Sequence, residues 1–73
     1  MAIQDLPAPM TGTVKELLVG VGDQVSVGDE LVIIESMKME IPVLAPIAGR
    51  ILEILVKEAQ DVAEGQDVAI IET

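Results

Sequence analysis

The chain has 73 residues, of which 51% are hydrophobic, yet it contains no aromatic residue, cysteine or histidine. These absences exclude a thiol nucleophile, a disulfide, a zinc finger and a Ser–His relay, so neither an enzyme acting alone nor a metal site is expected. Thirteen acidic residues against four basic ones give a formal net charge of −9, which would repel the phosphates of a nucleic acid.

The N-terminal part predicts two short strands. Residues 3–8 are read as an initial strand, and residues 13–19 are read as a second strand whose side chains point alternately to its two faces. This alternation places Val14, Glu16 and Leu18 on one face, as is typical of a half-buried strand. The apolar segments are shorter than the roughly 20 residues of a transmembrane helix, and no signal peptide precedes them. We therefore expect a cytoplasmic domain that does not insert into a membrane.

A third strand and its surrounding turns follow. Residues 31–35 form a nearly continuous apolar run, which favours a strand through the middle of a sandwich, and residues 68–72 repeat that run. Glycine followed by a polar residue marks turns at positions 22–23, 28–29 and 65–66.

The chain contains an internal repeat with a period of 37 residues. Residues 8–36 align with residues 45–73 without a gap, and eleven of the 29 aligned pairs are identical. Residues 3–8 align in the same way with residues 40–45. Two copies favour halves that close on each other about a pseudo-two-fold axis and exchange strands. We predict an all-β domain over residues 1–73, either a flattened barrel or a sandwich of two antiparallel sheets with about eight short strands.

Four glycines match in pairs across this repeat, Gly12 with Gly49 and Gly28 with Gly65. They are expected to serve positive φ angles or close strand approaches and not to bind a cofactor. The repeat also aligns Ser36 with Thr73 and Lys38 with Met1, so both termini should lie at the pole opposite Lys38.

The segment between the two halves, residues 35–42, breaks the usual rules for a turn. A strand that ends at Glu35 and one that begins at Glu40 leave a tight hairpin centred on Met37-Lys38. Two-residue hairpins prefer a type I′ turn with two positive φ angles, and Asn-Gly or Asp-Gly is the usual sequence there. A lone surface lysine is usually only a solvated charge. Because local rules are broken most often at functional sites, we predict that Lys38 is functional.

The same segment carries a resemblance to a known family. Residues 35–40 read E-S-M-K-M-E, preceded by G-D-x-L-x-x-I at 28–34 and followed by A-P-x-x-G at 45–49. This pattern resembles the biotin attachment site of the biotinyl domain family, which includes biotin carboxyl carrier proteins. The similarity extends over essentially the whole chain. Ser36 stands where that family usually has alanine, which is also small.

The resemblance implies that biotin is attached covalently to Lys38, with Met37 and Met39 contributing to recognition. It also implies that the chain is not itself an enzyme but a carrier within a biotin-dependent carboxylase, decarboxylase or transcarboxylase complex. A biotin protein ligase would attach the biotin, which would then shuttle CO₂ between a biotin carboxylase and a carboxyltransferase.

Two alternatives belong to other classes of protein. The first is a lipoyl carrier with a lipoylated Lys38, but the sister lipoyl domains usually have Asp-Lys-Ala in place of Met-Lys-Met. The second is a purely structural module of the kind found in transport adaptors, but those have a long helical insertion where this chain has only a hairpin.

Overall fold

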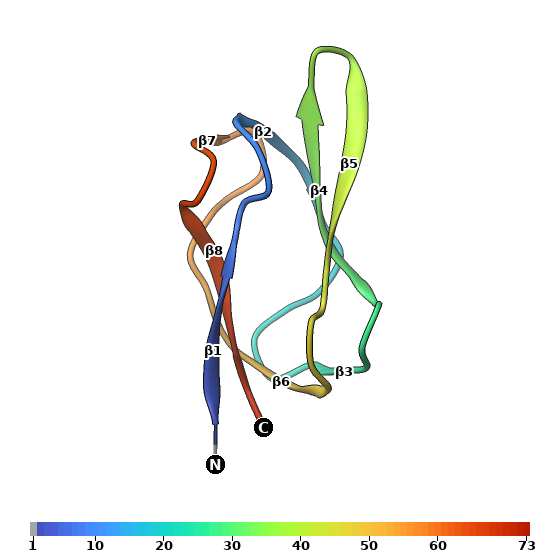
Figure 1. The fold of residues 1–73 in the computed structure, drawn as a ribbon, viewed down its shortest axis with the longest axis vertical. Helices are drawn as coiled ribbons and strands as arrows, with labels where there is room; N and C mark the ends of the chain where they lie inside the picture. The colour runs from blue at the N-terminus through green and yellow to red at the C-terminus, as the bar shows by residue number, and fades with distance from the viewer. Residues whose placement is uncertain (1) are drawn as a thin grey trace.

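The computed structural model describes residues 2–73, which form two four-stranded antiparallel sheets (Figure 1). In chain order the strands are β1 (Ile3–Pro7), β2 (Gly12–Leu17), β3 (Gln24–Val25), β4 (Glu30–Ser36), β5 (Met39–Leu44), β6 (Gly49–Ile54), β7 (Asp61–Val62) and β8 (Asp67–Glu72). One sheet has the order β1-β8-β6-β3 and the other has the order β5-β4-β2-β7. The predicted all-β fold is confirmed. Within residues 2–73 there is no helix with the length and apolar character needed to cross a membrane.

The sequence repeat is the symmetry of the fold. A shift of 37 residues carries β1–β4 onto β5–β8 and converts the strand order of one sheet into that of the other. In each sheet the two central strands come from one half of the chain, and both flanking strands come from the other half. The predicted exchange of strands is therefore present, and each half completes its sheet only with strands of its partner.

The core between the sheets is entirely aliphatic, and no polar or charged side chain is buried among the described residues. Its largest fully buried side chains are Leu31, Ile34, Ile51, Ile71, Val14, Val32 and Val68. The apolar runs at 31–35 and 68–72 lie in β4 and β8, which are inner strands, as predicted. Equivalent positions share this environment, since Ile34 and Ile71 are both 0% exposed.

The alternation predicted for residues 13–19 is wrong beyond Val14. The pairing of β2 with β4 shifts between Val14 and Glu16, so Lys15 is the extra residue of a β-bulge. Because the bulge reverses the side-chain alternation, Glu16 and Leu18 are exposed whereas Leu17 packs against the core. The strand also ends at Leu17, two residues before the predicted end.

The paired glycines serve two different purposes, both structural. A Cβ atom at Gly12 would lie 2.5 Å from the carbonyl oxygen of Glu35, and Gly49 approaches its neighbouring strand in the same way. Gly28 and Gly65 instead have φ angles of 89° and 86°, with open space around them. The repeat therefore conserves two close strand approaches and two left-handed turns.

Gly28→Ala is expected to lower the free energy of unfolding by about 1 kcal/mol, because a Cβ atom disfavours positive φ even where space is available. Urea unfolding followed by far-ultraviolet circular dichroism suits this chain, which has no aromatic residue. A free energy of unfolding that stays at the parent value would contradict this structural role.

Ala59 is in a strained conformation that its counterpart avoids. Its φ angle is 71°, and the equivalent residue of the first half is Gly22, with a φ angle of 92°. The N–H of Ala59 donates a 2.7 Å hydrogen bond to the carbonyl of Val14, which holds it there. Ala59→Gly should therefore raise the free energy of unfolding by about 0.5–1 kcal/mol. The matched change Gly22→Ala should lower it, and equal effects of the two changes would refute this explanation.

Candidate functional site

The hairpin of β4 and β5 extends beyond the body of the domain. The pairing of β2 with β4 reaches only to Thr13 and Glu35, whereas β4 and β5 continue to pair as far as Ser36 and Met39. Figure 1 shows this hairpin at one end of the longest axis of the molecule, which measures 36 Å. Its tip is thus free of neighbouring strands.

The tip is a two-residue turn with the backbone conformation predicted from its length. Met37 has a φ angle of 53° and Lys38 has one of 67°. Both values are positive, as a type I′ turn requires. Neither residue is glycine, asparagine or aspartate, so each positive φ costs on the order of 1 kcal/mol. The hairpin maintains this strained geometry because Ser36 and Met39 pair directly beneath it.

The side chains of the tip are open to solvent. Met37 is 91% exposed and Met39 is 63% exposed, although both are apolar. Lys38 is exposed and takes part in none of the ion pairs found among residues 2–73. The structure thus brings together the three residues that the sequence singled out, as an unpaired amine between two exposed thioethers.

A second cation lies at the base of the hairpin. Glu35 and Glu40 stand directly opposite each other on β4 and β5, and Lys15 forms an ion pair with Glu40. The hydrogen bond to Glu40 raises the pKa of Lys15, and the charges of Glu40, Glu35 and Glu16 add to this effect. Sequence reasoning missed this contact because Lys15 and Glu40 lie 25 residues apart in the chain, on two strands that are brought together only by the pairing of each with β4.

The two ends of the described chain lie far from the tip, as predicted. Ala2 donates a 3.0 Å hydrogen bond to Oγ1 of Thr73, and the N–H of Thr73 donates a 2.9 Å bond to the carbonyl of Ala2. Figure 1 shows both ends at the pole opposite the hairpin of β4 and β5. Met1, which the repeat aligns with Lys38, lies outside the described residues.

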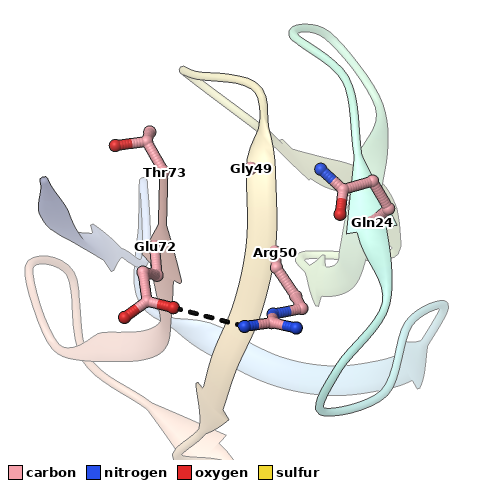
Figure 2. Close-up of a pocket in the computed structure, with 5 residues that line it drawn as sticks. All are labelled: Gln24, Gly49, Arg50, Glu72 and Thr73. Atoms are coloured by element: carbon pink, nitrogen blue, oxygen red, sulfur yellow. Dashed lines mark ion pairs between the residues drawn. The ribbon is translucent and has the colours of Figure 1, made fainter. Parts of the chain in front are cut away.

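An open depression of about 310 Å³ lies near the termini (Figure 2). It is lined by Gln24, Gly49, Arg50, Glu72 and Thr73. Nη2 of Arg50 lies 3.6 Å from Oε1 of Glu72, so its charge is partly neutralised. The repeat aligns Arg50 with Thr13, which lies near the hairpin. Oγ1 of Thr13 donates a 2.9 Å hydrogen bond to Asp61. No group of three or more acidic side chains within residues 2–73 is arranged to hold a metal ion.

The sequence of this chain matches the model of a known family, the biotin/lipoyl family. The family carries the description "Biotin-requiring enzyme", and its sequence model matches residues 4–71, nearly the whole chain. The chain belongs to this biotin/lipoyl family. The resemblance stated from the hairpin motif is therefore confirmed at the level of the family.

Relatives in this biotin/lipoyl family include small and large proteins. The chain is 55% identical over 42 residues to "Biotinylated protein TB7.3 homolog" of Mycobacterium leprae, a match that covers 58% of this chain and 59% of that protein. It is 50% identical over 44 residues to "Biotin carboxyl carrier protein" of Streptococcus mutans, covering 60% of this chain and 34% of the relative. The match thus spans less than two thirds of either relative.

Solved structures of larger members contain the same fold. The chain superposes on the Kluyveromyces lactis urea carboxylase with a TM-score of 0.92 and 36% identity, covering 99% of this chain and 6% of that one. It superposes on a single-chain, multi-domain long-chain acyl-CoA carboxylase with a TM-score of 0.90 and 33% identity, covering 97% and 7%. This biotin/lipoyl fold thus occurs as a small part of much larger carboxylase chains.

Proposed function

We propose that residues 1–73 are a biotin carrier domain and that Lys38 is the residue to which biotin is attached. The observation that carries this proposal is the tip of the hairpin, where an exposed, unpaired lysine occupies a strained two-residue turn between two exposed methionines. Strain and apolar exposure both reduce stability, so a functional role accounts for their presence. Relatives whose names refer to biotin support the same conclusion.

The residues at the tip fit a covalently attached biotin. Lys38 would hold it through an amide bond between Nζ and the carboxyl carbon of biotin. For that bond to form, the ligase would first activate the biotin carboxyl as an acyl adenylate, AMP would leave, and the ammonium group of Lys38 would lose two protons. A lysine amine is largely protonated near neutral pH, so the ligase has to accept a proton. When bound, biotin supplies a ureido nitrogen that takes up and releases a carboxyl group. The contribution of this chain would be to hold Nζ of Lys38, the attachment atom, at the exposed tip of the hairpin.

The proposed partners are a biotin protein ligase, a biotin carboxylase and a carboxyltransferase, all acting in the cytoplasm. Met37 and Met39 offer these partners polarizable, adaptable contact surface on both sides of the amine. Because Ala2 and Thr73 lie at the other pole, a tether joined there would leave the domain on the side away from Lys38. The hairpin could then enter successive active sites without obstruction by the tether.

The proposal is tested by co-expression of the chain with biotin ligase and measurement of its intact mass. A mass increase of one biotinyl group, mapped to the peptide that contains Lys38, is the expected result. Co-expression with lipoate ligase serves as the matched control and should leave the mass unchanged. A chain that stays unmodified with biotin ligase, or that accepts lipoate instead, would contradict the proposed function.

A further inference from the structure

The base of the hairpin has an unfavourable arrangement of charge. Glu35 and Glu40 are cross-strand partners, and like charges directly opposite each other destabilise a strand pair. Lys38 follows Glu35 by three residues and precedes Glu40 by two, and it is the only basic residue in β4, the turn and β5. These two carboxylates therefore attract any cation within reach.

Lys15 supplies that cation from a different part of the sheet. It lies in β2, two strands away from β5, and its side chain crosses β4 to form the ion pair with Glu40. Of the other acidic residues on β2 and β7 near this end, Glu16 adds a weaker attraction to Lys15, and Asp61 accepts a hydrogen bond from Thr13. With Glu40 held in this way, Lys38 forms no ion pair with any other residue of the described range 2–73.

The opposite half of the molecule lacks this ion pair although its backbone is equivalent. The repeat places Leu52 at the position of Lys15, also within a bulge, and Ile3 at the position of Glu40. Leu52 is 38% exposed and Ile3 is 61% exposed. The fold thus accommodates either an ion pair or two apolar residues at these positions. The ionic pair occurs at the end that carries Lys38, which indicates a role in the hairpin and not in the architecture.

We propose that Lys15 is a positioning residue for Lys38, because it occupies the Glu40 carboxylate and so keeps the Lys38 amine unpaired and available for acylation. This inference rests on the proposed function. A carboxylate beside an ammonium group favours the charged form of the amine, and only the neutral form can attack an activated carboxyl group. Lys15 acts through Glu40 and does not contact the reacting atoms.

The test measures the reactivity of Lys38 without any ligase. The full chain is treated at low salt with the N-hydroxysuccinimide ester of acetic acid. The amine forms an amide, N-hydroxysuccinimide leaves and the buffer takes up the proton. Peptide mass mapping then compares acetylation of Lys38 with that of Lys57 as an internal reference. In Lys15→Met we expect the relative rate at Lys38 to fall about two- to fivefold, the range that an exposed ion pair supports.

Three further variants separate charge from structure. Lys15→Arg should keep the parent rate because it retains the cation, and Lys15→Met/Glu40→Gln should regain it because the competing carboxylate is gone. Leu52→Met, the matched change in the other half, should have no effect. The loss in Lys15→Met should also disappear in 1 M salt, where the screening length is about 3 Å.

An unchanged rate in Lys15→Met would overturn the inference, as would a slow rate that persists in the double variant or in 1 M salt. The proposed function is judged separately, by the mass of the parent chain after co-expression with biotin ligase. A parent chain that the ligase ignores would contradict biotin attachment, whereas the acetylation rates would still decide whether Lys15 protects the amine of Lys38.

Discussion

Lys38→Arg is expected to abolish biotinylation and to change the free energy of unfolding by less than about 0.5 kcal/mol. The side chain is exposed at a turn and forms no ion pair within the described chain, so arginine removes no packing and keeps the charge. Arginine does, however, remain protonated and cannot provide the amine that the amide bond requires. Intact mass after co-expression with the ligase and urea unfolding measure the two effects.

Lys57→Arg is the matched control, because it replaces another exposed lysine outside the hairpin. It should leave both the modification and the stability at the parent values. A loss of several kcal/mol in Lys38→Arg would mean that Lys38 is a structural residue, and full modification of that variant would assign the attachment to another amine.

Gly12→Ala should have the largest effect on stability, a loss of about 3 kcal/mol in the free energy of unfolding. The added Cβ atom would lie 2.5 Å from the carbonyl oxygen of Glu35 and 2.7 Å from Cγ2 of Ile34. Because the first of these atoms belongs to the backbone of β4, the substitution cannot be relieved by a side-chain rotation. The two central strands of the sheet would have to move apart at the base of the hairpin of β4 and β5.

Gly20→Ala is the control for this substitution. The nearest atom to its added Cβ would be a side-chain oxygen of Asp23 at 3.9 Å, and Gly20 is not among the glycines with positive φ. Its free energy of unfolding should therefore stay within about 0.5 kcal/mol of the parent. Equal losses at Gly12 and Gly20 would show that glycine flexibility, and not the close approach of β2 to β4, determines the cost.

The sequence by itself determined the architecture and the candidate site. The 37-residue repeat predicted two interlocked halves, and the structure places the identical residues Ile34 and Ile71 in equivalent, fully buried positions. The short connection after Glu35 predicted positive φ at Met37 and Lys38 because a two-residue hairpin allows few backbone conformations. These features are local or repeated, so they can be read from spacing alone.

Only the tertiary structure decided which way the side chains point beyond Val14. The alternation of the sequence cannot reveal a bulge, because an extra residue is defined by the register of the partner strand, and here β4 leaves Lys15 without a partner. That single shift turns Leu17 toward the core and is accompanied by the ion pair of Lys15 with Glu40, 25 residues away along the chain. The charge environment of the hairpin thus follows from the pairing of three strands, which no single segment of the sequence contains.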